Sequence, residues 1–140
     1  MIMPAVQIVL PSFNHAKFLP HALDGILNQE FTNWELTIVN DGSTDDTSQV
    51  LAEHRVYRDP RVTVITNLKN RGLPASLNIG HRAGIAPLCS WVSSDNFSRP
   101  SHLAALYETM MSGDFDFVQG KWVVHRGTEV VHKTIEGYKG

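Results

Sequence analysis

The 140-residue sequence predicts an α/β domain with a mostly parallel, doubly wound sheet and an antiparallel hairpin near its C-terminal end. Short apolar runs alternate with segments of helical periodicity, which is typical of parallel strands joined by crossover helices. Near the C-terminus, two further strand-like runs, 115–124 and 129–132, flank Arg126-Gly127-Thr128, as in a hairpin. The expected strands of the parallel sheet begin at Val6, Trp34, Val62 and Leu88.

The first two helices are predicted from their apolar stripe and from capping residues. Pro20 is tolerated in the first turn of the first helix, where the amide that proline lacks would have no partner. Ser43 or Thr44 is expected to cap the second helix, and Ser43 with Asp46 fits the spacing of a capping box. The stripe of the first helix consists of Leu19, Leu23, Ile26 and Leu27.

Two later helices are predicted from proline and glycine signals. One follows Gly72 with Pro74 in its first turn, and the other opens at Pro100 and ends at the run 112–114. The expected apolar face of the former is Leu73, Leu77, Ile79 and Ala83. That of the latter is Leu103, Leu106, Tyr107 and Met110.

Composition and charge exclude several functional classes. The chain is 42% hydrophobic and 19% charged, enough to bury a core, and its net charge of −2 offers no basic surface for nucleic acid. The single cysteine, Cys89, rules out an internal disulfide, and its apolar run predicts a buried thiol in a reducing compartment. The sequence has neither a membrane-spanning apolar stretch nor a signal-peptide pattern. We therefore expect a cytoplasmic protein, either free or peripheral at the inner face of the plasma membrane.

The most informative stretch is Asp41-Gly42-Ser43-Thr44, where the second strand gives way to a helix. Open α/β sheets bind ligands beyond the carboxyl ends of their strands, and such a loop presents backbone N–H groups and here a carboxylate. Asp, Gly and Ser also dominate ordinary turns, so the motif alone is equally compatible with a turn and a helix cap.

Neighbouring motifs favour the ligand-binding interpretation. Five motifs follow one another in the order and near the spacing found in the family 2 inverting glycosyltransferases of the GT-A fold, which residues 6–106 closely resemble. The motifs are Pro11-Ser12-Phe13-Asn14, the helical segment 22–29, the Asp41 turn, residues 59–62 and Asn70-Arg71-Gly72-Leu73. The resemblance implies transfer of a sugar from a nucleoside-diphosphate sugar to the hydroxyl of an unidentified acceptor. Among the donors, a UDP-sugar is expected first. Such transfer serves cell-surface polysaccharide biosynthesis.

The resemblance also assigns roles to individual residues. Asp41 matches the carboxylate that binds the base or ribose, and Asn40 replaces the first member of the family's frequent Asp-Asp pair. Phe13 either stacks on the base or packs in the core, and Arg71 either meets a phosphate or is solvated. The loop along the nucleoside corresponds to Pro11, Ser12, Phe13 and Asn14, and the segment that closes over the nucleotide to Asn70, Arg71 and Gly72.

The family's metal-binding position falls on Asp95. There a divalent cation, Mn²⁺ or Mg²⁺, would bridge the two phosphates of the donor, and both ions prefer oxygen ligands. Ser93 and Ser94 occupy positions where relatives often carry a second carboxylate, and we expect an aspartate restored at Ser94 to strengthen metal binding. The alternative is that Asp95-Asn96 only begins a loop and caps the helix near Pro100.

The sequence shows no residue in the context of the family's general base, since neither Glu129 nor Glu136 lies in the matching surroundings. Residues 1–140 are therefore predicted to be a single GT-A-type nucleotide-sugar-binding domain that lacks the acceptor-binding half and transfers no sugar alone. Its hairpin edge, with an apolar face of Trp122, Val124 and Val131, predicts a homodimer through residues 115–135. The alternative function is a non-catalytic module of the same fold that binds a nucleotide or a protein partner.

Other site classes receive little support. The seven histidines lack the spacing of a zinc site, and only His125 and His132 would meet, across the hairpin. The first strand is not followed by a Gly-x-Gly-x-x-Gly motif, and no Gly-Lys-[Ser/Thr] phosphate loop is present.

Overall fold

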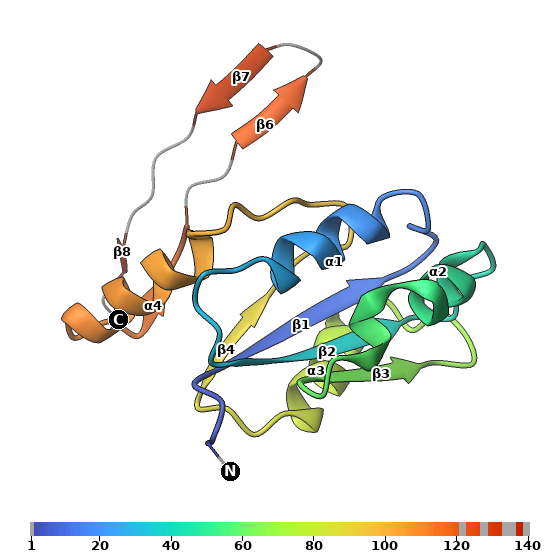
Figure 1. Ribbon diagram of the computed structural model, residues 1–140, viewed down its shortest axis with the longest axis horizontal. Helices are drawn as coiled ribbons and strands as arrows, with labels where there is room; N and C mark the ends of the chain where they lie inside the picture. The colour runs from blue at the N-terminus through green and yellow to red at the C-terminus, as the bar shows by residue number, and fades with distance from the viewer. Residues whose placement is uncertain (1, 121–122, 127–128, 133–136, 139–140) are drawn as a thin grey trace.

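A computed structural model describes residues 2–120, 123–126, 129–132 and 137–138, with side chains over 2–120. Four parallel strands form its central sheet in the order β3-β2-β1-β4, which confirms the predicted parallel sheet (Figure 1). The strands are β1 (Val6–Ser12), β2 (Trp34–Asn40), β3 (Val62–Thr66) and β4 (Leu88–Trp91). The chain adds β2 and β3 on one side of β1 and then crosses over to add β4 on the other side. The order of the strands therefore reverses between β1 and β4.

Helices cover both faces of the sheet, as expected for a doubly wound fold. In Figure 1, α1 and α2 lie on one face and α3 lies on the other. Leu103 of α4 joins the core on the α1 side. The helices are α1 (Leu19–Leu27), α2 (Thr47–Glu53), the short 3₁₀ helix η1 (Arg55–Arg58), α3 (Leu73–Ala83) and α4 (His102–Ser112). The last helix begins two residues after the predicted Pro100, which lies in the preceding turn.

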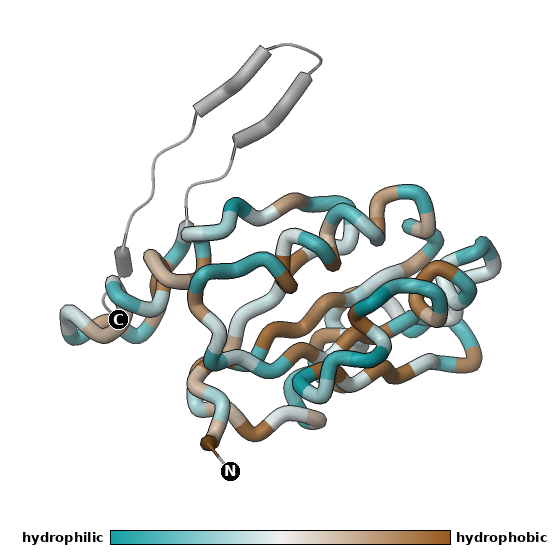
Figure 2. Tube along the Cα trace, viewed as in Figure 1, coloured by the Kyte–Doolittle hydropathy of each residue, from teal (hydrophilic) through white to brown (hydrophobic). Residues whose placement is uncertain are grey.

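The main core lies between the sheet and α1. Every residue of β1 is buried, as expected for a central parallel strand covered on both faces. Figure 2 shows hydrophobic residues gathered along the central strands. The predicted stripe of α1 is confirmed at Leu19, Leu23 and Ile26, which are all but inaccessible to solvent. Together with strand residues such as Ile8 and Leu36, they form the principal hydrophobic cluster.

The predicted apolar face of α3 is wrong at both of its ends, because Leu73 and Ala83 are exposed. The buried residues of α3 are instead Ser76 and Gly80. A Cβ atom on Gly80 would lie 2.3 Å from Cγ1 of Val9, so the helix backbone rests directly on β1. Small residues face the sheet here because the helix approaches too closely for larger side chains.

The expected burial of Cys89 is also wrong, since this free cysteine is exposed. Cys89 pairs in register with Gln7 on the α3 side of the sheet, and β4 is an edge strand. α3 packs against β1 and β2. The side chains of Cys89 and Trp91 therefore lie beyond the cover of that helix, and Trp91 is half exposed.

The C-terminal hairpin is confirmed as a backbone pairing of β6 (Val123–Arg126) with β7 (Glu129–His132). The predicted strand 115–124 is not continuous, because it contains β5 (Phe117–Val118), which pairs with β8 (Gly137–Tyr138), and only the start of β6. Each pair forms its own two-stranded sheet. In the hairpin His125 is paired with Val130, so His125 and His132 are not directly opposite. The expected apolar face of Trp122, Val124 and Val131 lies outside the residues whose side chains are described.

Over the described residues, no helix combines the length and the apolar character that crossing a bilayer requires.

Candidate nucleotide-binding site

The candidate site lies at the carboxyl edge of the sheet, where β1 to β4 end side by side. Two backbone bonds hold the exits of the first three strands in register. The Asp41 N–H donates to the Ser12 carbonyl at 2.8 Å, and the Asn67 N–H donates to the Asn40 carbonyl at 2.9 Å. All but two of the predicted site residues lie in the loops beyond these strand ends, and the two exceptions, Pro11 and Ser12, are the last residues of β1. This edge, next to the reversal of strand order, is where open α/β sheets bind ligands.

Asp41 is the buried centre of this edge, with only 3% of its surface exposed. Its carboxylate accepts hydrogen bonds from Nδ2 of Asn67 at 2.7 Å, from the Arg71 N–H at 3.0 Å and from the Gly72 N–H at 2.9 Å. Burial raises the pKa of Asp41, but the hydrogen bonds from Asn67, Arg71 and Gly72 outweigh it, and the net pKa is lowered. Asp41 is therefore ionised at neutral pH and holds the segment 67–72 against the end of β2.

Gly42 explains why glycine follows this aspartate. Its φ is +71°, and a Cβ atom there would lie 2.5 Å from the carbonyl carbon of Lys69. The segment 67–72 thus passes directly over the Gly42 backbone. Gly72, with φ of +86°, also adopts a conformation that favours glycine, and its N–H is shared between Asp41 and Oδ1 of Asn70. The predicted closing segment is therefore built on Asp41, while the side chains of Asn70 and Arg71 remain exposed.

The end of β1 contributes residues of two kinds. Pro11 and Ser12 are buried, and the Ser12 hydroxyl has no hydrogen-bond partner among the described residues. Phe13 is 40% exposed, which keeps its ring available to a planar ligand. The side-chain oxygen of Asn14 does not face a ligand in this way, because it accepts hydrogen bonds from the loop that follows β2.

The predicted capping box before α2 is wrong. The helix begins at Thr47, and Asp46 at its N-cap makes no side-chain capping bond. Asp45 takes over the capping task instead, since its Oδ1 accepts from the Thr47 N–H at 3.0 Å and from the Thr47 hydroxyl at 2.6 Å. Ser43 is not available as a cap because its hydroxyl accepts from the Asn14 N–H at 3.0 Å.

The loop after β4 presents Asp95 with Ser93 rather than with Ser94. The Ser93 hydroxyl donates to Oδ1 of Asp95, and the Asp95 side chain is exposed. Ser94 is 1% exposed, and its Oγ lies 2.7 Å from Nδ1 of His15. The side chain that shares the surface with Asp95 is therefore that of Ser93. His15, which the sequence interpretation did not single out, links this loop to the loop after β1.

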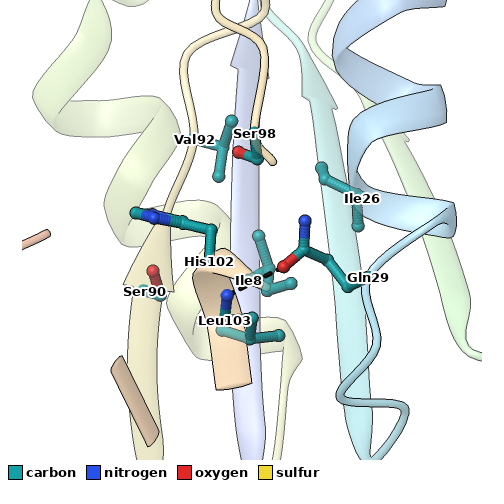
Figure 3. A pocket seen from close by; sticks show the side chains of 8 residues that line it. All are labelled: Ile8, Ile26, Gln29, Ser90, Val92, Ser98, His102 and Leu103. Carbon is teal, nitrogen blue, oxygen red and sulfur yellow. Dashed lines mark hydrogen bonds between the residues drawn. The ribbon is translucent and has the colours of Figure 1, made fainter. Parts of the chain in front are cut away.

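The return of the chain from Asp95 to α4 is anchored by Gln29, another residue without a predicted role. Gln29 is buried, and its Nε2 donates to the Arg99 carbonyl at 2.7 Å while its Oε1 accepts from the Leu103 N–H at 2.8 Å. Figure 3 shows Gln29 and His102 lining a small pocket between α1, α4 and the sheet. Burial lowers the pKa of His102. This pocket lies beneath α4, and although Val92 and Ser98 of the loop after β4 line it, none of the predicted site residues does.

The donors around Asp95 suit a hard divalent cation. Asp95 supplies one exposed carboxylate and Ser93 an adjacent hydroxyl, both oxygen ligands of the kind that Mg²⁺ and Mn²⁺ prefer. Within the described part of the chain, no three His, Cys, Asp or Glu side chains gather as a metal-binding group. The donor set therefore fits a cation held jointly by one carboxylate and by phosphate oxygens of a ligand.

In sequence, the chain is similar to known glycosyltransferases. The model of "Glycosyl transferase family 2" matches residues 7–136. "Chondroitin synthase" of Escherichia coli is 36% identical over 97 residues, which are 69% of this chain and 14% of that protein. The E. coli "UDP-Glc:alpha-D-GlcNAc-diphosphoundecaprenol beta-1,3-glucosyltransferase WfgD" is 23% identical over 134 residues, which are 96% of this chain and 52% of that protein.

Solved structures show the same fold. Staphylococcus aureus TarS 1–349 in complex with UDP-GlcNAc superposes with a TM-score of 0.68 at 22% identity, over 76% of this chain and 31% of that one. The mannosyltransferase PcManGT from Pyrobaculum calidifontis, in complex with GDP-Man and Mn²⁺, superposes with a TM-score of 0.69 at 22% identity, over 77% and 32%. The chain spans at most about half the length of these curated relatives. With nearly its whole length matched by the family model, the chain belongs to glycosyl transferase family 2.

Proposed function

We propose that this chain is the nucleotide-sugar-binding part of an inverting glycosyltransferase that uses a nucleoside-diphosphate sugar, with UDP-sugars preferred. The observation that carries the proposal is the placement, at one sheet edge, of the ionised Asp41 after β2 and of the Ser93–Asp95 pair, with its exposed carboxylate, after β4. These are a nucleoside-type and a diphosphate-type binding surface on the two loops that flank the loop after β1. The UDP, UDP-GlcNAc and GDP-Man complexes of structural neighbours support the same ligand class.

Each residue contributes a distinct task in this proposal. Asp41 binds the base or ribose and holds the 67–72 segment beside it, and the Ser12 hydroxyl offers a further hydrogen bond. Phe13 offers its exposed ring to the base, and Arg71 offers its exposed guanidinium to a phosphate. Asp95 would hold Mn²⁺ or Mg²⁺, which, when bound, neutralises charge on the departing nucleoside diphosphate.

We expect Mn²⁺ to strengthen UDP binding to the wild type and to have no such effect in Asp95→Asn. The physical reason is that the amide removes the charge that the cation needs from the protein. Isothermal titration with UDP and with GDP, each with and without Mn²⁺, measures the effect. A Mn²⁺ enhancement that survives Asp95→Asn would contradict the role of Asp95.

The matched pair of serine variants sharpens this test. Ser93→Asp adds a second carboxylate beside Asp95 and should increase the Mn²⁺ enhancement, since each hard ligand adds charge to the site. The sequence predicts that Ser94→Asp would strengthen metal binding. We now propose Ser93→Asp in its place, because Ser94 is buried against His15. An aspartate at Ser94 should lower stability through the burial of a charge and leave the Mn²⁺ enhancement unimproved.

Catalysis needs a general base that the site described here does not supply. Inversion requires a carboxylate near the acceptor hydroxyl, on the face of the sugar opposite the leaving group. Asp41 is occupied with backbone N–H groups, and Asp95 is assigned to the diphosphate. We therefore propose that the 140 residues bind the donor without transferring sugar. We place the whole protein in cell-surface polysaccharide biosynthesis in the cytoplasm, free or at the inner face of the plasma membrane.

We further propose that the chain forms a homodimer through residues 115–135. The hairpin β6–β7 pairs only within itself among the described strands, so each of its strands presents an unpaired edge to a second copy. Sedimentation velocity at micromolar concentration should show a species of twice the monomer mass, which Val124→Lys on β6 should dissociate. A monomer across that concentration range would contradict the dimer.

A non-catalytic binding module is the second candidate function. It is favoured by one observation, the pairing of Asp95 with a serine hydroxyl where a second carboxylate would strengthen a metal site. A donor-turnover assay on the full gene product separates the two candidates. Acceptor-dependent release of nucleoside diphosphate supports the enzyme, and nucleotide binding without turnover supports the module.

A further inference from the structure

Asn14 and Asp45 bind each other's loops in a reciprocal arrangement. Asn14, in the loop after β1, accepts at Oδ1 from the Thr44 N–H at 2.8 Å and from the Asp45 N–H at 3.3 Å. In return, Asp45, in the loop after β2, accepts at Oδ2 from the Ala16 N–H at 3.0 Å. We refer to these three bonds between the two loops as the Asn14–Asp45 bridge.

The backbone at Asn14 is set for this arrangement. Its φ is +54°, and among the described residues it is the one non-glycine residue with positive φ. Asparagine tolerates this left-handed conformation better than most residues because its short polar side chain bonds locally. The Asn14 N–H also donates to the Ser43 hydroxyl at 3.0 Å, so that both its backbone and its side chain point at the second loop.

Asp45 combines two separable tasks. Its Oδ1 caps α2 through Thr47, and its Oδ2 reaches across to Ala16. The two backbone bonds and the hydroxyl bond favour the carboxylate over the neutral acid, and they outweigh burial so that the pKa of Asp45 is lowered. Oδ1 of Asp45 therefore binds within the loop after β2, and Oδ2 binds the loop after β1.

We propose that Asn14 and Asp45 are positioning residues that fix the distance between the loops after β1 and β2 and thereby shape the nucleoside-binding edge. The side-chain oxygen of Asn14 is fully engaged by Thr44 and Asp45, so it acts through the loops and not as an acceptor for the nucleotide. Ser12 at the end of β1 and Phe13 just after it, on one side, and Asp41 just after β2, on the other, are the groups whose separation the bridge sets. The inference rests on the proposed function.

The test compares variants that remove different parts of the bridge, with UDP and GDP as probes in the presence of Mn²⁺. Asn14→Ala removes the acceptor, and Asn14→Gly removes it while easing the positive φ. Asp45→Ser keeps an oxygen able to cap Thr47 and is too short to reach Ala16. Each variant is expected to weaken nucleotide binding about tenfold, the magnitude of a lost hydrogen bond at an ordered junction.

Two controls separate positioning from general stability. Glu35→Ala removes an acceptor that holds the Ile85 and Ala86 N–H groups at the opposite, amino edge of the sheet, at 2.6 and 2.7 Å. It should lower the melting temperature while leaving nucleotide affinity unchanged. The Asn14→Ala/Asp45→Ser double variant should bind about as weakly as either single variant, because both act on one junction.

The outcomes separate the two proposals. If the wild type binds neither UDP nor GDP, the proposed function fails and this inference fails with it. If the wild type binds and the bridge variants bind equally well, only the inference fails. A loss in Asn14→Ala that Asn14→Gly restores would show that backbone strain, and not the bridge, sets the affinity, and would also overturn it.

Discussion

Replacing Gly42 with alanine is expected to destabilise the fold by about 2–5 kcal/mol and to abolish measurable nucleotide binding. Two costs combine at this position. The φ of +71° is unfavourable for alanine, and the new methyl carbon would lie 2.5 Å from the carbonyl carbon and 2.7 Å from the Cα of Lys69. Backbone atoms cannot rotate away as a side chain can, so the segment 67–72 must lift off Asp41. Urea unfolding and isothermal titration with UDP measure the two effects.

A second variant distinguishes the two costs. Gly42→Asn relieves much of the φ penalty, because asparagine tolerates left-handed backbone, yet it carries the same Cβ. We expect Gly42→Asn to recover a minor part of the stability and none of the binding. Wild-type affinity in either variant would contradict the close passage of the 67–72 segment over Gly42.

Removing the carboxylate in Asp41→Ala should weaken nucleotide binding by roughly 1–3 kcal/mol, which is about 5- to 150-fold. The loss arises because the Asn67 side chain and the Arg71 and Gly72 N–H groups are left without their acceptor. Asp59→Ala is the matched control. Asp59 is likewise a hydrogen-bonded aspartate, since its Oδ2 accepts from Nη2 of Arg61 at 2.7 Å. It precedes β3, however, and so lies at the amino edge of the sheet, opposite the candidate site. It should cost stability and leave UDP affinity unchanged.

The same aspartate predicts a pH dependence. Its pKa in the folded state is lowered, so its contribution to stability is complete above the unfolded pKa of about 4 and is lost as the pH falls through the folded value. Asp41→Asn lacks this contribution at every pH. The difference in unfolding free energy between wild type and Asp41→Asn should therefore be largest near pH 7 and shrink below pH 4. A difference that stays constant over this range would show that the Asp41 charge contributes nothing to folding.

The fold followed from the sequence where local patterns were decisive. Leu23 and Ile26 recur at helical spacing, and the run from Val62 to Thr66 is β-branched, so α1 and β3 were predicted within a residue or two. The failures have a common physical origin in tertiary geometry. Nothing local in the sequence shows that α3 approaches β1 closely enough to favour Gly80 over Leu73, or that α3 stops short of Cys89.

The candidate site was predicted as a set of loops but not as a set of interactions. Motif order located Asp41 and Asp95, because their spacing relative to the strands is a property of the chain alone. The hydrogen-bond partners of Asp41 were not predictable in the same way. The Arg71 and Gly72 N–H groups that donate to its carboxylate belong to the next βα unit of the chain. Asp45 directly follows the Asp41-Gly42-Ser43-Thr44 motif, but no role was predicted for it. Its capping of Thr47 and its bond to Ala16 needed the structure.

The place of β1 in the sheet has a consequence for synthesis of the protein. Val6 pairs with Trp34 on one side and with Leu88 on the other, so β1 is made before the other strands of this sheet but is fully paired only when β4 has been added. While residues between β2 and β4 are being made, one edge of a strand buried at every position in the finished domain lacks its native neighbour. Such an edge is prone to aggregation, and long-range parallel pairing is slow. A nascent chain that pauses before Leu88 is therefore the stage at which this domain most needs a chaperone.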